Sequence, residues 1–182
     1  SFSEQRADRP ISSFKNLWRN HSKQFWLIIV ITAGGSLFFY STTTYMQKFL
    51  INTSGFSREV GTQIMTVALI VYMIAQPLFG YLSDIAGRKP LLLVFGTGGT
   101  CCTIPAFHAI AQTRSPIIAG AIIIALLLLL SAYTSISGLI KAELFPPHIR
   151  SLGVAFPYAI GNSLFGGTAE YVALALKDAG HE

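Results

Sequence analysis

The residues of this sequence that are best suited to chemistry are polar side chains inside long apolar stretches. Glu170 lies in such a stretch, where a carboxylate is costly to bury and therefore marks a functional position. It predicts a possible proton site, a gate or an ion pair with another helix, and a purely structural ion pair is an equal alternative. His108 titrates near neutral pH and suits proton transfer, but packing near a helix end is the simpler interpretation.

Hydroxyl, amide and amine side chains also recur at helical spacing, so that each group shares one face of a helix. Three such stripes are Ser36, Tyr40 and Thr44; Tyr133, Ser137 and Lys141; and Tyr158 with Asn162. Polar faces inside a membrane predict the lining of an aqueous cavity, and helix packing through hydroxyl groups is the alternative. Lys141 lies near a helix end, where its long side chain can reach the membrane surface and act as a simple anchor.

The composition determines the class of protein. The 182 residues are 52% hydrophobic and only 12% charged, with a mean hydropathy of +0.54. Soluble domains carry about 25% charged residues, so this is an integral membrane protein of the all-α class. The net charge of +5 does not indicate nucleic-acid binding, because no basic patch is interleaved with aromatic residues.

Nothing in the sequence predicts an enzyme. His108 and Glu170 lack a spacing that pairs a nucleophile with a base, so no catalytic residues are expected. The adjacent Cys101 and Cys102 do not form a metal-ligand pattern. We therefore expect no metal and no cofactor.

The elements that position these side chains are membrane spans of about 20 residues. The apolar stretches predict five of them, at about 25–46, 60–82, 91–111, 117–140 and 152–176. Residues 1–24 are polar and basic, with Phe14, Leu17 and Trp18 at helical spacing, and predict a linker ending in an amphipathic helix on the membrane surface. A solvated linker is the alternative. The start at Ser1 and the end just after the fifth span predict a piece of a longer protein, truncated before a last helix.

The distribution of the 13 Lys and Arg residues predicts the orientation. The N-terminal segment and the second and fourth connections carry most of them: Arg6, Arg9, Lys15, Arg19, Lys23, Arg88, Lys89, Lys141 and Arg150. The other side carries Lys48, Arg58, Arg114 and Lys177. Because basic loops stay in the cytoplasm, the N-terminus is predicted to be cytoplasmic and the C-terminus external.

Several segments resemble a known group of transporters. GYLSDIAGRKP at 80–90 is similar to a cytoplasmic-loop signature of the major facilitator superfamily, and AELFPPHIRSLG at 142–153 is similar to its second signature. YMQKFL at 45–50 and FGGTAEYVAL at 165–174 resemble the metabolite:proton symporter family. YTSISG at 133–138, beside KAE at 141–143, resembles its α-ketoglutarate-transporting branch.

The resemblance implies five helices, the seventh to eleventh, of the C-terminal six-helix bundle of a partial major-facilitator transporter fold. It assigns Tyr40, Thr43, Thr44, Tyr133 and Ser137 to a central substrate cavity, to which Asn162 is added from its stripe. It also implies a cytoplasmic gate formed by Asp84, Arg88, Glu143 and Arg150.

The function implied is proton-coupled import of a small carboxylate, α-ketoglutarate first, by alternating access through a bacterial inner membrane. Symport of proline or betaine, citrate, shikimate or a sugar is the alternative, as is a membrane subunit without transport. The expected partners are the carboxylate, protons, the lipid bilayer and the N-terminal half of the transporter. Because no span carries Lys or Arg near its middle, we expect the main substrate cation to come from that half.

Overall fold

The computed structural model describes residues 14–179, and helices are the regular elements of this part of the chain. The elements are α2 (Phe14–Asn20), α3 (Ser22–Tyr40), η1 (Ser41–Tyr45), α4 (Met46–Asn52), α5 (Arg58–Ala86), α6 (Arg88–Gln112), α7 (Pro116–Thr134), α8 (Ser137–Glu143), α9 (Arg150–Gly161), η2 (Asn162–Gly166) and α10 (Gly167–Asp178). The first part of the predicted linker, with Arg6 and Arg9, and the end of the chain at 180–182 lie outside the described residues.

Four helical runs are long and apolar enough to cross a membrane: Ser22–Asn52, Arg58–Ala86, Arg88–Gln112 and Pro116–Glu143. Charged residues are confined to their ends because a bilayer core cannot solvate them. The expected all-α membrane fold is thereby confirmed. The fifth expected span forms the run 150–178, which is not one of these four, so its crossing of the membrane stays a prediction.

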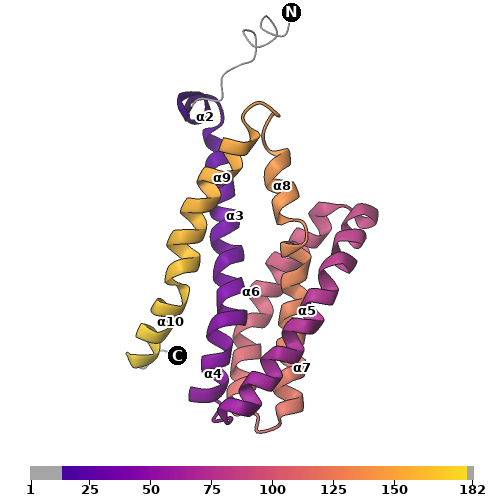
Figure 1. Ribbon diagram of the computed structural model, residues 1–182, viewed down its shortest axis with the longest axis vertical. Helices are drawn as coiled ribbons and strands as arrows, with labels where there is room; N and C mark the ends of the chain where they lie inside the picture. The colour runs from indigo at the N-terminus through magenta and orange to yellow at the C-terminus, as the bar shows by residue number, and fades with distance from the viewer. Residues whose placement is uncertain (1–13, 180–182) are drawn as a thin grey trace, which may run out of the picture.

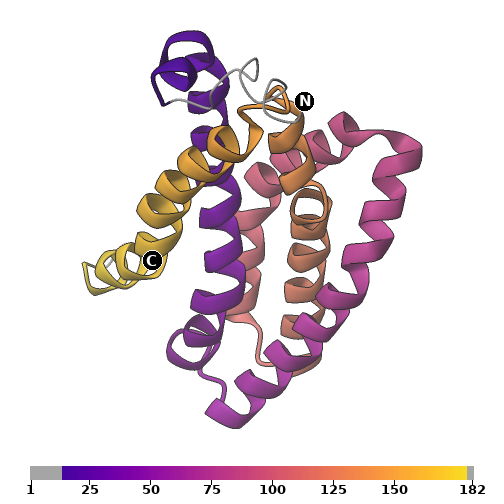
Figure 2. The ribbon, with the colours of Figure 1, turned by 45° about the horizontal axis from the view of Figure 1, so that its top comes forward.

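The helices form two groups that lie side by side. In the first group, α9, η2 and α10 pack along α3; in the second, α5 and α6 pack against α7. Figures 1 and 2 show α3 in the middle, with the α9–α10 run on one side of it and α5 on the other. The end that carries α2 is called the α2 end below, and the opposite end is called the α4 end.

A single residue reverses the chain between α5 and α6. Gly87 has φ +87°, a left-handed conformation that side chains with a Cβ rarely adopt. The turn is therefore shorter than the sequence predicted, and the helices begin and end closer together than the expected bounds of 82 and 91. As a result, Arg88 lies in the first turn of α6, facing the α2 end of α8.

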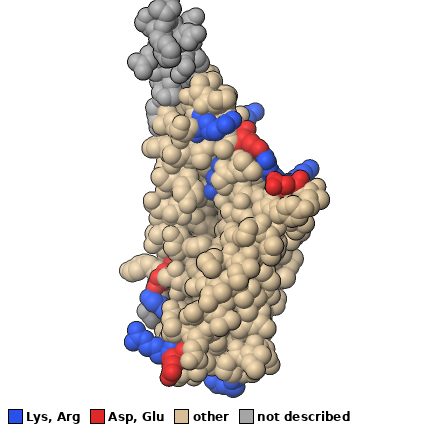
Figure 3. All heavy atoms as spheres, turned by 45° about the vertical axis from the view of Figure 1, so that its right-hand side comes forward, with Lys and Arg blue, Asp and Glu red and all other residues tan. Residues whose placement is uncertain are grey.

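A small cluster at the α2 end joins the first helix to the later ones. Leu17 of α2, Phe25 of α3 and Phe145 are buried together, while Trp18 is 52% exposed. Helix α2 is therefore amphipathic, with its apolar side on the protein. Charged side chains gather toward both ends of the face drawn in Figure 3, separated by a broad uncharged band.

Three of the long runs are irregular near their middles. The π-helical segments η1 and η2 interrupt the first and last runs, and residues 135–136 separate α7 from α8. The hydroxyls of Thr134 and Ser135 bond the carbonyls of Leu130 and Ser131, 3.2 and 2.7 Å away, and such bonds compete with the helical ladder. Irregular backbone inside membrane helices is commonly associated with function.

Candidate functional site

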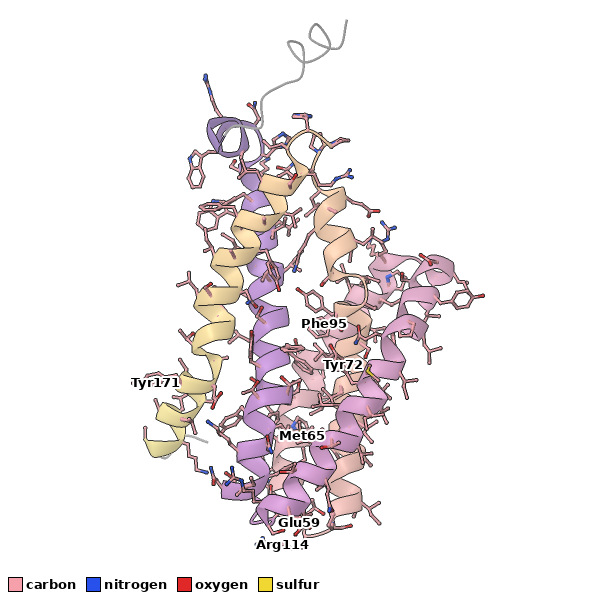
Figure 4. All side chains as sticks on the ribbon, in the orientation of Figure 1. Glu59, Met65, Tyr72, Phe95, Arg114 and Tyr171 are labelled. Carbon is pink, nitrogen blue, oxygen red and sulfur yellow. The ribbon has the colours of Figure 1, made fainter. Side chains whose placement is uncertain are left out.

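The two helix groups meet at Tyr133, which α7 directs toward α3. Its hydroxyl donates to the Ile31 carbonyl at 3.2 Å, and its ring stacks on Phe95 with centroids 4.8 Å apart. Figure 4 shows Phe95 and Tyr72 in the interior between helices, whereas Tyr171 points outward from α10. The approach of the ring to α3 is close because Gly35 has no side chain; a Cβ there would lie 2.1 Å from Tyr133 Cε1. Tyr133 is thus held on three sides.

A second polar contact joins α3 to η2. The Ser36 hydroxyl donates to Asn162 Oδ1 at 2.8 Å, so residues 126 positions apart in the sequence share one polar seam. Tyr40 lies one turn farther along α3 and packs against the backbone of Gly166, where a Cβ would approach the Tyr40 ring to 2.6 Å. The structure therefore brings Tyr40 and Asn162 together at the same interface.

The stripe through Ser36, Tyr40 and Thr44 does not stay on one face. Because η1 is π-helical, its hydrogen bonds join residues five positions apart. Residues four positions apart therefore no longer lie on one face of the helix. Ser36 is buried and Thr44 is exposed, while the Thr43 hydroxyl bonds back to the Phe39 carbonyl at 2.6 Å. Thr43 and Thr44 are accordingly separate from the Ser36–Asn162 contact.

Sequence reasoning missed the burial of Lys141. Instead of reaching the surface as an anchor, its side chain is only 3% exposed. Its ammonium nitrogen lies 4.5 Å from the ring centroid of Tyr158 on α9 and 5.6 Å from that of Tyr133 on α7. One feature of the sequence could have predicted this contact. Tyr133 and Lys141 are two helical intervals apart, which places them on the same side of a helix. Ser137, between them on α8, is half-buried.

The expected gate residues are only partly together. Arg88 at the start of α6 and Glu143 at the end of α8 form an ion pair, with side chains 34% and 50% exposed. Arg150 instead donates from Nε to the Phe145 carbonyl at 3.3 Å. Asp84 is exposed and makes no hydrogen bond or ion pair with the described residues. Two of the four residues therefore form an ion pair with each other in this structure.

Glu170 on α10 forms an ion pair with Lys48 on α4, across the α4 end of the first helix group. The two side chains are 28% and 48% exposed, so water reaches both. Nearby, Lys177 Nζ donates to the Thr53 hydroxyl at 2.9 Å. Both contacts tie α10 to the end of the first run.

A hydrogen-bonded network joins α5 to α7 beside the break that precedes α8. Tyr72 donates to Thr134 Oγ1 at 2.9 Å, and Thr134 donates to Gln76 Oε1 at 3.1 Å. The Gln76 amide in turn donates to Ser131 Oγ at 3.2 Å. The network fixes α7 just before the break and leaves α8, which carries Lys141 and Glu143, as a separate short segment.

A cavity of about 570 Å³ lies at the α4 end between η1, α4, α6 and α10. Its lining is mainly apolar, and no Lys or Arg of the described chain contributes to it. His108 is on its wall and contacts Gln112, with 2.9 Å between His108 Nε2 and Gln112 Nε2. A charged ligand needs cations or aimed donors, so the Lys141 region fits one better than this cavity.

Comparisons with known proteins agree with these features. Residues 2–178 match the family model described as sugar (and other) transporter. None of the solved structures matches the chain at a significant level.

Three curated relatives illustrate the range of similarity. An alpha-ketoglutarate permease of Escherichia coli strain K12 is 48% identical over 98% of this chain and 41% of its own length. A glycine betaine/proline/ectoine/pipecolic acid transporter of Dickeya dadantii is 30% identical over 90% of this chain and 32% of its own length. A proline/betaine transporter of Escherichia coli K12 is 28% identical over 91% and 33%.

This chain spans less than half the length of these relatives. The relatives are permeases and transporters rather than enzymes. The match of nearly the whole chain to the family model, on an all-helical fold with apolar runs of membrane-spanning length, is decisive. The chain belongs to the sugar (and other) transporter family of the major facilitator superfamily.

Proposed function

We propose that this chain is part of a proton-coupled symporter that imports a small carboxylate, with α-ketoglutarate as the first candidate. The observation that carries the proposal is the 48% identity with an alpha-ketoglutarate permease over 98% of the chain. Three polar contacts between helices support it. A hydroxyl of α3 meets an amide of η2, a tyrosine hydroxyl of α7 bonds a carbonyl of α3, and a buried amine of α8 lies beside rings of α7 and α9. Such groups suit a charged, hydrogen-bonding solute.

In this proposal, Tyr40, Tyr133, Ser137 and Asn162 line the substrate pathway, together with Thr43 and Thr44 on the neighbouring face of the first run. The exposure of Thr44 supports a position on a cavity that another part of the transporter completes. The whole transporter then includes an N-terminal half, which faces this seam. A route through the membrane between two halves allows alternating access.

The ion pair between Arg88 and Glu143 is the latch of the cytoplasmic gate. Partly exposed ion pairs contribute about 0–1 kcal/mol, so thermal motion can break and re-form this one during a transport cycle. The α2 end is cytoplasmic in this proposal, because it carries Arg88, Lys89 and Arg150. The membrane is the inner membrane of a bacterium.

The test is uptake by the complete transporter in proteoliposomes. Radiolabelled α-ketoglutarate should accumulate when an inward proton gradient is imposed, and the accumulation should collapse when a protonophore removes the gradient. Vesicles without protein provide the control. Absence of gradient-dependent uptake of any carboxylate would refute the proposal.

Import of betaine or proline is the second candidate, since two of the relatives described above are transporters of these solutes. Both solutes carry a single carboxylate together with a positive charge. Competition separates the candidates: an excess of unlabelled glycine betaine should leave α-ketoglutarate uptake unchanged. Betaine uptake that excess α-ketoglutarate does not reduce would favour the second candidate.

A further inference from the structure

The ammonium of Lys141 is the most unusual charge in the described chain. Its side chain is 3% exposed, although lysine is almost never fully buried without a partner. Its neighbours are the rings of Tyr158 and Tyr133, at 4.5 and 5.6 Å from the nitrogen. Among residues 14–179 it makes no hydrogen bond and no ion pair. We call these three residues the Lys141 site.

Aromatic rings alone do not satisfy a buried ammonium. A ring face attracts a cation, but none of the three N–H donors of Lys141 has an acceptor among the described residues. Burying a charge without an acceptor is costly, and the cost falls only when an anion or several oxygens approach. The Lys141 site therefore lacks an anionic acceptor among the described residues.

The carboxylate closest to Lys141 in the sequence already forms an ion pair with another residue. Glu143 lies two residues farther along α8, but it is exposed and paired with Arg88. It therefore belongs to the surface latch, on a different side of α8 from the buried Lys141. The positive charge of Lys141 is left for a ligand.

The site is also open on one side. Tyr158 is 45% exposed, whereas Tyr133 is 5% exposed and fixed by its bond to the Ile31 carbonyl. In this inference a ligand approaches the ammonium from the side of Tyr158, and the buried Tyr133 forms the opposite wall. Ser36 and Asn162 form a polar contact within the first helix group, and Asn162 lies one turn beyond Tyr158 on the same run.

We propose that Lys141 binds a carboxylate group of the transported solute, and that Tyr133 and Tyr158 hold its ammonium by cation–π contacts when the site is empty. This inference rests on the proposed function and names the residue that makes the protein selective for anions. The helical break before α8 places this residue on the same short segment as the latch residue Glu143. Binding of a carboxylate to Lys141 and breaking of the Arg88–Glu143 ion pair would therefore both affect the position of α8.

The test uses the complete transporter in detergent, with α-ketoglutarate as the probe. Lys141→Met has a similar length and no charge, so it fits the buried position. Because an unpaired buried charge is removed, the melting temperature of the ligand-free variant should stay equal or rise. The Kd for α-ketoglutarate should increase by about 10- to 100-fold, the range expected for losing a hydrogen bond to a charged group.

Two further variants sharpen the comparison. Lys141→Arg keeps the charge and should bind more tightly than Lys141→Met. Lys89→Gln removes an exposed cation from the same end of the protein and should leave the Kd unchanged. The proposal is overturned if Lys141→Met binds α-ketoglutarate as tightly as the wild type does.

Failure of the proposed function gives a different result. In that case the wild type itself does not bind α-ketoglutarate, and the same comparison is made with glycine betaine, which also has a carboxylate. A weaker Kd for betaine in Lys141→Met supports the carboxylate role of Lys141 with another substrate. An unchanged Kd overturns that role.

Discussion

The ammonium nitrogen of Lys141 lies 4.5 Å from the ring centroid of Tyr158, inside the helix bundle. The two residues come from α8 and α9, which belong to two different helical runs, and they meet beside Tyr133 of α7. A cation–π contact of this kind contributes about 0.5–2 kcal/mol, depending on how far water is excluded. It is strong enough to orient the lysine and weak enough for an anion to replace it.

Tyr158→Leu removes the ring nearest to this ammonium. The side chain of Tyr158 is 45% exposed, so the loss should destabilise the protein only slightly. The lysine then loses its preferred orientation, and the affinity for α-ketoglutarate should fall, whereas Tyr158→Phe keeps the ring and should change it less. Equilibrium binding to the purified transporter measures both variants. Equal affinity of Tyr158→Leu and the wild type would show that the ring does not position Lys141.

Gly35→Ala should push Tyr133 out of its place. The new Cβ would lie 2.1 Å from Tyr133 Cε1, and overpacking of this kind costs about 1–3 kcal/mol. A lower melting temperature of the detergent-solubilised protein and a weaker affinity for substrate are expected. Gly34→Ala is the matched control, because no atom lies within 4 Å of its added Cβ. Equal melting temperatures for the two variants would contradict the close approach of α3 and Tyr133.

Neutralising Arg88 or Glu143 should weaken the latch between α6 and α8. A partly exposed pair contributes about 0.2–1 kcal/mol, so Arg88→Gln should change the rate of uptake by a factor of roughly 1.4 to 5. The exchange of charges in Arg88→Glu combined with Glu143→Arg should restore part of the rate. Initial rates of uptake in proteoliposomes provide the measurement, and Lys89→Gln is the control. A double variant slower than either single change would argue against the pair.

Glu170→Gln tests whether the ion pair with Lys48 is structural. Because both side chains are partly exposed, we expect a loss of stability of no more than about 1 kcal/mol. Accumulation of substrate driven by a proton gradient should persist, since the carboxylate is already committed to Lys48. The measurement is uptake with and without the gradient. Uptake that no longer responds to the gradient would identify Glu170 as a proton carrier instead.

The network of Tyr72, Gln76 and Thr134 should respond as a unit. Hydrogen bonds between membrane helices contribute about 0.6 kcal/mol on average and up to about 1.7 kcal/mol. Tyr72→Phe and Thr134→Val each remove one partner of the same bond, so their effects on stability should not add. Thermal unfolding of the two single variants and the double variant gives the coupling. Additive effects would show that the bond does not contribute.

Much of the fold follows from the sequence because a bilayer imposes strong rules. Apolar length predicted the spans. It did not predict that the connection between the spans 60–82 and 91–111 would shrink to Gly87 alone. Helical periodicity failed where the backbone is irregular: the π-helical η1 turns Thr44 away from Ser36. Such a segment depends on packing against other helices, which periodicity does not contain.

The candidate site was harder to predict than the fold. Tyr133 and Asn162 could be identified from polar residues at helical spacing, but their partners Ile31 and Ser36 lie 102 and 126 residues away in the chain. The position of Lys141 near the end of a span suggested a surface anchor. Its burial results from α9 crossing beside α8, a tertiary contact that no local pattern reveals.

If a proton-driven transporter binds its carboxylate substrate at the buried Lys141, replacing this lysine should weaken transport at low substrate concentration. Concentration-dependent uptake of α-ketoglutarate in proteoliposomes under an inward proton gradient measures this effect, with wild type and Lys141→Met compared at equal amounts of protein. Saturable uptake by the wild type and a KM raised by about 10- to 100-fold in the variant are expected. An unchanged KM in Lys141→Met would contradict the role of this lysine in binding.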